Sequence, residues 1–322
     1  MAGTKIIGRL SQIGIAKEST RGTVAAPSYW VPFNDLTIDQ KIESVFDAQA
    51  YGIIEDSVGM YLTKQWAAGS LNANLYDHSF GLILYSLLGT LTSHSEHSGE
   101  TTVYDNIFNV AESTQHKSLT FAFHDPGSGQ DYAFPNGVIS KLDITYALKQ
   151  FVQYTATLMA QKGTTESAYT PSTTTENVFL PQNLTLEVAS TTYAVKSAKL
   201  SINQNIESQD VLGSTSPADF LTKEFNVEGQ FEIILNANTF VTDLLAGTAV
   251  DVNLSLVNTA VTIGSATNPT LTFDMPQCYL TDVSTPRKVK DLVYQTIKFR
   301  ATYSTGSSSM LEATLTNVIN GY

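Results

Sequence analysis

Charged residues are scarce in this chain of 322 residues. Asp, Glu, Lys and Arg together make up 15% of it, well below the roughly one quarter that is typical of globular proteins. Lys and Arg number 18 against 30 Asp and Glu, which gives a formal net charge of -12. Because a surface that binds phosphates needs clustered cations, this balance argues against a protein that grips nucleic acid.

Cysteine occurs once, as Cys278, which excludes an intramolecular disulfide framework and a zinc site built on several thiolates. Long apolar runs are also missing, since no stretch approaches the ~20 residues of a membrane-spanning helix. Met1 to Leu10 lacks the apolar core of a secretory signal. We therefore expect a soluble protein made in the cytoplasm, with no membrane partner and no cofactor.

An internal repeat organises the chain. Residues 36–44 read LTIDQKIES and residues 200–208 read LSINQNIES, so that six of nine positions are identical. Further downstream, 62–66 (LTKQW) matches 221–225 (LTKEF), and Phe134-Pro135 matches Met275-Pro276, in the same order. The repeat therefore predicts a duplicated domain.

A polar segment rich in Thr, Ser and Gly separates the two copies, and such a composition is typical of linkers. The predicted divisions are an N-terminal arm (1–33), a first module (34–162), a linker (163–177), a second module (178–304) and a C-terminal arm (305–322).

Apolar and polar residues alternate through both copies of the repeated nonapeptide, which predicts half-buried strands. Trp66 and Leu71 have opposite parity, so we expect a bulge near 67–69. The apolar stripe in 77–91 predicts a helix with Asp77 as its N-cap, and 238–245 predicts a shorter one. The fold class is thus mainly β: two tandem sandwich or barrel modules, each with a flanking α-helix.

Residues that could carry catalysis or bind metal do not converge in the sequence. His94, Glu96 and His97 lie in a polar Ser-rich insertion without a third fixed ligand. His124-Asp125 precedes Gly127-Ser128-Gly129, but the strand–turn–helix elbow of a serine hydrolase is missing and Pro126 indicates a turn. We predict no enzyme activity, no catalytic or cofactor-binding residues and no metal site.

The stretch from Ile13 to Thr23, the following Tyr29–Phe33 and the strand at 36–44 resemble the N-terminal half of phage tail tube proteins. The likeness continues through the long loop with Gly52, the LTKQWAAGSL strand and the apolar helix. It implies a β-sandwich whose inner sheets join around a ring and line a channel. A duplicated chain would close that ring with three copies, a pseudo-hexamer, in the tail of a siphovirus-type virion.

Under this resemblance, charged residues on the polar strand faces line the channel, and their excess of acid keeps DNA from sticking. These residues are Asp39, Lys41, Glu43, Glu207, Glu224, Glu228 and Glu232. The expected partners are further copies of the chain, tape-measure protein and genomic DNA held without specific binding, and the tail terminator and tip proteins. Assembly would take place in the host cytoplasm.

Residues 1–33, 45–61 and 306–322 are the predicted contacts between rings, the second because it is too long for a tight hairpin turn. Two other functions stay open at this point. One is the inner tube of a contractile tail or related injection machine. The other is a carbohydrate-binding or adhesin-like double β-sandwich, which Tyr61, Tyr76 and Tyr104 would serve as exposed aromatics.

Overall fold

The computed structural model describes residues 5, 7–126, 131–166, 168–235, 237–287, 289 and 292–322. Within them the chain is mainly β, with large antiparallel sheets and two α-helices, which confirms the predicted fold class. The run Gly127-Ser128-Gly129, weighed above as part of a hydrolase motif, and residues 1–4 of the predicted N-terminal arm lie outside the described residues.

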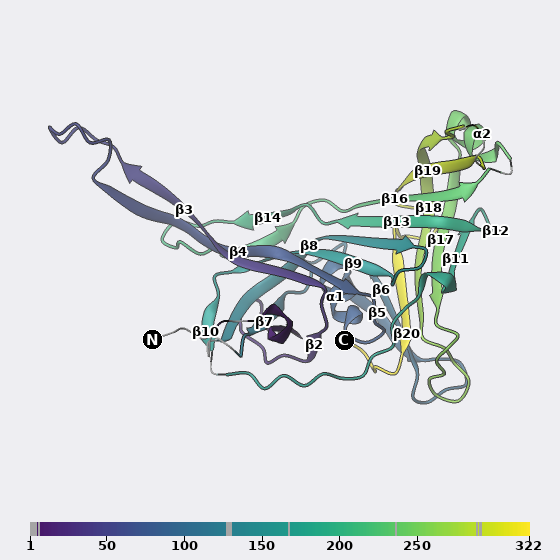
Figure 1. Ribbon diagram of the computed structural model, residues 1–322, viewed down its shortest axis with the longest axis horizontal. Helices are drawn as coiled ribbons and strands as arrows, with labels where there is room; N and C mark the ends of the chain where they lie inside the picture. The colour runs from purple at the N-terminus through teal and green to yellow at the C-terminus, as the bar shows by residue number, and fades with distance from the viewer. Residues whose placement is uncertain are drawn as a thin grey trace.

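A central antiparallel sheet runs through both halves of the chain (Figure 1). Eight of the described strands form it, in the order β3 (Asp35–Asp47), β4 (Gly59–Asn74), β9 (Gln153–Gln161), β8 (Asp131–Ala147), β13 (Val195–Asn203), β16 (Asn226–Ile234), β19 (Tyr294–Ala301) and β18 (Thr270–Ser284). The first four come from the first half and the last four from the second. Because β8 pairs directly with β13, the halves share one sheet.

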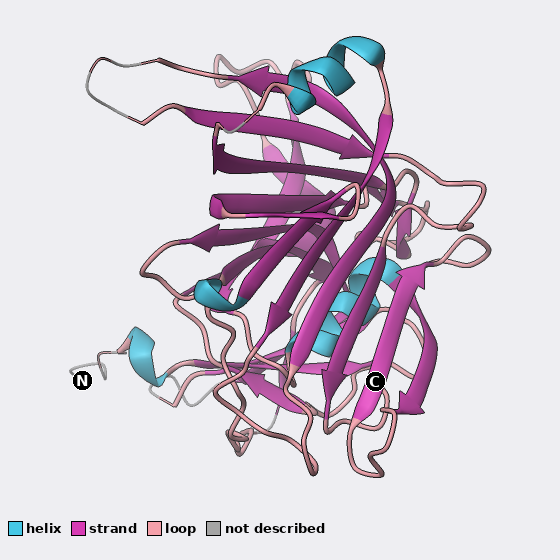
Figure 2. Cartoon of the chain, turned by 90° about the vertical axis from the view of Figure 1, so that its right-hand side faces the viewer, coloured by secondary structure: helices cyan, strands magenta, loops and turns pink. Residues whose placement is uncertain are grey.

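Further strands form a second layer, and two long strands, β8 and β18, take part in both layers. Figure 2 shows one helix among the strands and another at the edge of the molecule. The N-terminal part of β8 leaves the central sheet and lies among β2 (Tyr29–Val31), β1 (Gln12–Lys17), β7 (Leu119–His124) and β10 (Thr164–Glu166). The N-terminal part of β18 lies likewise among β12 (Thr191–Tyr193), β11 (Leu184–Val188), β17 (Ala249–Val257), β20 (Glu312–Asn317), β6 (Tyr104–Val110) and β5 (Gly89–Glu96). The apolar faces of the two layers enclose the core.

The two helices differ in burial. All of α1 (Phe80–Leu88) except Tyr85 is buried between the layers, whereas Phe240 alone is buried in α2 (Thr239–Ala246). The predicted bounds of the first helix were too wide. Its N-cap is Ser79, and Gly89 ends it in the left-handed conformation at φ 88, a position that glycine favours, so that the chain turns into β5. The carboxylate of Asp77 instead accepts hydrogen bonds from Asn177.

The described parts of the segments outside the repeat pack into the fold. Ile13 and Ile15 of β1 are buried in the core, and β20 pairs with β18 on one side and β6 on the other. In the predicted linker, the Glu176 carboxylate accepts hydrogen bonds from the backbone N–H groups of His78 and Ser79 at the start of α1. Short 3-10 turns, η1 (Gly8–Leu10) and η2 (Pro181–Asn183), precede β1 and β11.

Two predictions about the repeated strands were wrong. The β4–β9 ladder is regular through 67–69, and the register shift in the β3–β4 pair lies at Thr63, between the pairs Glu43–Lys64 and Ser44–Leu62. Leu71 therefore faces the core while Trp66 lies on the opposite face, under the Lys64 ammonium. In the second copy, Asn205 adopts φ 47 and breaks the nonapeptide into β13 and β14 (Ile206–Gln209).

The two halves share details of strand register. The β8–β9 pair has a bulge between Ile139 and Lys141, and the β18–β19 pair has one between Leu280 and Asp282, at the corresponding positions of the repeat. The pairing that follows each bulge also corresponds, with Leu142 opposite Ala156 and Val283 opposite Ile297. Bulges are local and specific, so they give reference points for aligning the halves.

The C-terminal residue anchors its segment on α1. The ring of Tyr322 covers Gly81, where an added methyl group would overlap it. Its hydroxyl donates a hydrogen bond to the carbonyl of His78 at 2.8 Å and accepts one from Asn317 at 2.6 Å. Burial raises the pKa of Tyr322 well above its ordinary value, so the hydroxyl stays protonated.

We predict that Tyr322→Ala lowers the free energy of unfolding by about 3 kcal/mol, because the ring that packs against Gly81 and the core is lost. Tyr322→Phe keeps the ring and should cost about 1 kcal/mol for the lost hydrogen bonds. Urea unfolding of unassembled protein, followed by circular dichroism, measures both. Equal costs would show that the ring packing contributes little.

Candidate functional site

The polar face of the central sheet carries five of the seven residues predicted to line a channel. Directly opposed residues on neighbouring strands point to the same side of a sheet. A series of such pairs connects β3 to β16, through Thr37, Ser70, Thr157, Lys141, Asn203 and Asn226. Thr37 and Asn226 therefore share one face. The predicted residues that follow at alternate positions on this face are Asp39, Lys41 and Glu43 of β3, and Glu228 and Glu232 of β16.

The other two predicted residues, Glu207 and Glu224, lie outside the strands of the central sheet. Glu207 lies on a two-stranded ribbon formed by β14 and β15 (Asp219–Thr222), apart from the central sheet, and its carboxylate is 2.7 Å from the Lys223 ammonium. Glu224 lies in the connection between β15 and β16. The break at Asn205 separates them, because it ends the alternation that the repeat suggested.

The sequence patterns did not predict several basic residues on the same face. Lys141 of β8 and Lys199 of β13 lie at the junction of the halves, and Lys298 and Arg300 lie on β19. Lys141 is 2.8 Å from Asp143, Lys298 is 3.0 Å from Asp282, and Lys41 is 3.1 Å from Asp39. Alternation in β8 and β19 could have revealed these residues. The face therefore carries interleaved charges of both signs instead of a predominantly acidic lining.

Asp143 is the carboxylate at the junction itself, with Lys141 beside it and Lys199 at 3.5 Å on the neighbouring strand. Burial by itself would raise its pKa. The hydrogen bonds from Lys141 and Ser201 and the charges of the two lysines outweigh burial and hold the pKa of Asp143 below its usual value. The ionised form of this carboxylate thus stabilises the β8–β13 pairing.

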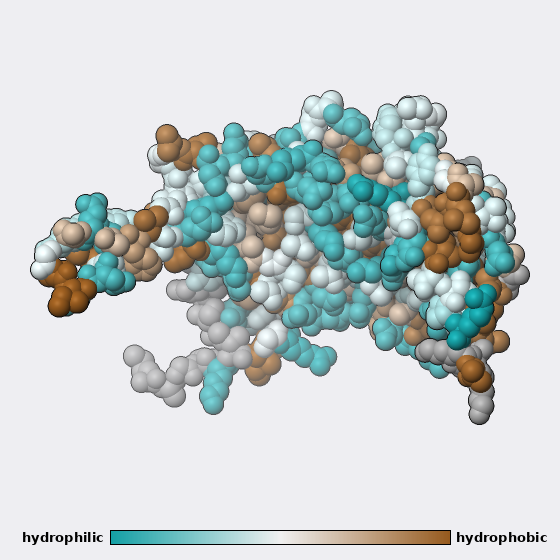
Figure 3. All heavy atoms as spheres, turned by 90° about the horizontal axis from the view of Figure 1, so that it is seen from above, coloured by the Kyte–Doolittle hydropathy of each residue, from teal (hydrophilic) through white to brown (hydrophobic). Residues whose placement is uncertain are grey.

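A projecting hairpin of residues 42–62 continues β3 and β4 beyond the body of the protein (Figures 1 and 3). It is called the arm below and is distinct from the predicted N-terminal and C-terminal arms. Its apolar side chains are exposed, with Phe46 59% and Tyr61 65% accessible, and Figure 3 shows apolar atoms at its tip. The others are Ile42, Val45, Tyr51, Ile53, Ile54, Val58, Met60 and Leu62. Apolar surface of this extent is typical of an interaction site.

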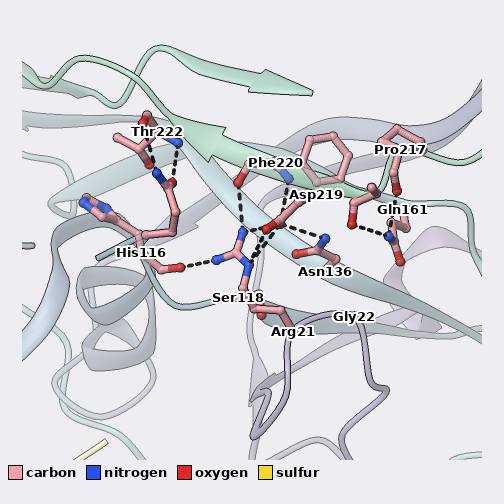
Figure 4. A network of polar contacts seen from close by, with 12 residues as sticks. Arg21, Gly22, His116, Ser118, Asn136, Gln161, Pro217, Asp219, Phe220 and Thr222 are labelled. Atoms are coloured by element: carbon pink, nitrogen blue, oxygen red, sulfur yellow. Dashed lines mark hydrogen bonds and ion pairs between the residues drawn. The ribbon is translucent and has the colours of Figure 1, made fainter. Parts of the chain in front are cut away.

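The β14–β15 ribbon, with its connecting loop (206–222), is the counterpart of the arm in the second half, and it is docked on the first half (Figure 4). The Arg21 guanidinium binds the Asp219 carboxylate at 2.6 Å and also donates to the carbonyls of His116 and Phe220. Gln161 donates to the Pro217 carbonyl at 2.8 Å. Lys64 donates to Ser208 and Asp210, and the Gln65 N–H to the Thr215 carbonyl.

The histidines serve separate local contacts. His97 Nδ1 is 2.9 Å from Asp105, His124 Nδ1 is 2.9 Å from Asp131, and His116 Nδ1 is 2.7 Å from the Leu87 carbonyl, where burial lowers the His116 pKa. Burial raises the pKa of Cys278 to about 12, so its thiol is unreactive. Among the described residues, no group of three or more His, Cys, Asp or Glu could hold a metal ion. None of the helices in the described ranges is long and apolar enough to span a membrane.

We predict that Asp143→Asn reduces the stability of the protein most at neutral pH. A depressed folded-state pKa means that Asp143 stabilises the fold above its unfolded pKa of about 3.9, and that this stabilisation is lost as the pH falls through the folded value. Urea midpoints measured from pH 7 to pH 3 should therefore converge for the two proteins at the acid end. A difference that stays constant with pH would contradict the assignment.

We also predict that Arg21→Ala loosens the ribbon without unfolding the body. The bidentate, half-buried pair with Asp219 should be worth about 2 kcal/mol. Amide hydrogen exchange in residues 206–222 should accelerate, while exchange in β8 and β9 stays unchanged. Lys41→Ala, which removes an exposed pair, is the control and should have no effect on the ribbon.

A known protein family matches this chain. The sequence model of a family described as phage tail tube protein matches residues 8–305, which is most of the chain. No curated protein matches the chain.

Proposed function

Because this chain belongs to the phage tail tube protein family, we propose that it is the major tube subunit of a long, non-contractile phage tail. As a member it is a structural protein of the tail that self-assembles into a tube. The proposal adds that three copies close one ring, that the rings stack, and that the stack conducts DNA. It assigns no enzymatic step and no cofactor to the chain.

The observation that carries this proposal is the continuous sheet across the β8–β13 junction. It supports a duplicated tube module, since the two halves pair side by side as two subunits of a ring would. The corresponding bulges in β8–β9 and β18–β19 support the same reading. A chain that carries two ring positions closes a six-position ring with three copies.

The polar face of the sheet is the proposed channel wall, with Asp39, Lys41, Glu43, Glu228 and Glu232 on it. Its carboxylates lie among Lys141, Lys199, Lys298 and Arg300, several of them in ion pairs. Paired cations offer DNA phosphates few free partners, so tape-measure protein and genomic DNA would pass without specific binding. Terminator and tip proteins are the proposed partners at the two ends of the tube.

Electron microscopy of the purified protein tests this function. We expect rings or hollow tubes, and an end-on cryo-EM reconstruction should show three chains per ring with Glu228 and Glu232 on the inner wall. Monodisperse monomers at all concentrations would contradict self-assembly. Tubes with these glutamates on the outer wall would contradict the lining alone.

A further inference from the structure

The central sheet ends in two strand edges that have no partner among the described residues. β3 pairs with β4 alone, and the C-terminal part of β18, from Leu280 to Ser284, pairs with β19 alone. Side chains at both edges that point toward the core, Ile38 and Val283, are only partly buried. Unpaired edges of this kind favour pairing with another chain.

Within the same chain, the strands that correspond to these two edge strands are paired with each other. By the repeated nonapeptide, β13 is the counterpart of β3, and by the shared bulge, β18 is the counterpart of β8. β8 and β13 are paired, with Leu142 opposite Ile202, and both of these side chains are fully buried. The counterparts of Leu142 and Ile202 are Val283 and Ile38. The internal junction therefore gives both the partner and the register for the free edges.

We propose that the β8–β13 junction is repeated between chains, with β18 of one copy paired to β3 of the next. This inference rests on the proposed tube function and specifies its ring interface. The transferred register places Val283 opposite Ile38, Ser284 opposite Thr37 and Asp282 opposite Asp39. The pairing is antiparallel and completes a closed sheet with no free edge.

Charge at the new junction is balanced. Asp39 and Asp282 would face each other, and two opposed carboxylates alone would weaken the pairing. Each already has a lysine on its own chain, Lys41 at 3.1 Å and Lys298 at 3.0 Å. The junction thus unites two acids with two bases, much as Asp143 lies between Lys141 and Lys199 at the internal junction.

The arm has a corresponding place in this interface. At the internal junction, the ribbon that follows β13 lies on the first half and contacts Lys64, Gln65 and Gln161. The counterparts of these three residues in the second half are Lys223, Glu224 and Thr302.

A groove of about 730 Å³ opens at two of these counterparts, Lys223 and Glu224. Apolar side chains of Val110, Phe225, Tyr303 and Met310 line it, together with Lys223 and Glu224. The arm of the next copy, which follows β3 directly, would lie across this groove. Its exposed Phe46 and Tyr61 would there find the apolar contacts that they lack within their own chain.

Disulfide cross-linking of assembled particles tests the register. Thr37→Cys combined with Ser284→Cys should form covalent dimers and closed trimers on oxidation, because both positions are exposed and opposed in the transferred register. Thr37→Cys with Thr296→Cys is the matched control, since Thr296 lies one strand further from the edge and should yield little product. Each single variant should yield none, because the native Cys278 is buried.

Micrographs of the same samples separate the two hypotheses. Rings or tubes in which Thr37 and Ser284 do not cross-link, or in which the control pair reacts equally, would overturn the register and leave the tube function standing. An absence of rings in wild-type protein would overturn both. Amide hydrogen exchange of the wild-type protein is a second measurement that does not depend on the variants. Exchange of the β3 amides should slow on assembly.

Phe46→Asp tests the arm separately and should raise the concentration needed for assembly by at least about tenfold. Leu212→Asp is the control, because Leu212 is fully exposed but lies on the ribbon loop whose docking is internal. We expect the control to assemble as the wild type does. Equal losses in both variants, or normal assembly of Phe46→Asp, would overturn the role of the arm.

Discussion

Backbone pairing between β8 and β13 is the interaction on which the rest of this structure depends. It joins the two halves into one central sheet with one continuous polar face, while the β20–β6 pair joins them in the second layer. Without it, each half would leave two long strand edges open, and such edges pair indiscriminately. The pairing also fixes the orientation of the halves, because a slip of one residue would turn every side chain of β13 to the wrong face.

That constraint determines the electrostatics of the face. Lys141 and Lys199 come from different halves, and only the junction brings both to Asp143. Carboxylates that looked like an acidic lining in the strands taken singly are offset once β8 and β19 are placed beside them. Ion pairs leave such a face few free cations for a polyanion, in addition to the effect of net charge.

The sequence predicted what depends on local periodicity and on repetition: the strand of the first nonapeptide, the mainly β fold and a connection between β3 and β4 too long for a tight turn. It did not predict what depends on one backbone angle or on distant pairing. The left-handed Asn205 removes Glu207 from the sheet face. Asn adopts this conformation more often than most residues, but the sequence does not tell which Asn will do so. The use of β20 to join β18 to β6 likewise requires knowledge of partners far apart in the chain.

The arm and the ribbon differ in length and in exposed apolar surface, and their proposed binding tasks differ as well. The ribbon at 206–222 binds within its own chain, where the effective concentration is high, and polar contacts such as Arg21–Asp219 suffice to hold it. An arm that binds another copy must offset the translational and rotational entropy lost on association. The greater length of the arm and its exposed Phe46, Ile54 and Tyr61 supply the additional apolar area. Under the proposed ring interface, this difference between arm and ribbon follows from using one kind of contact both within a chain and between chains.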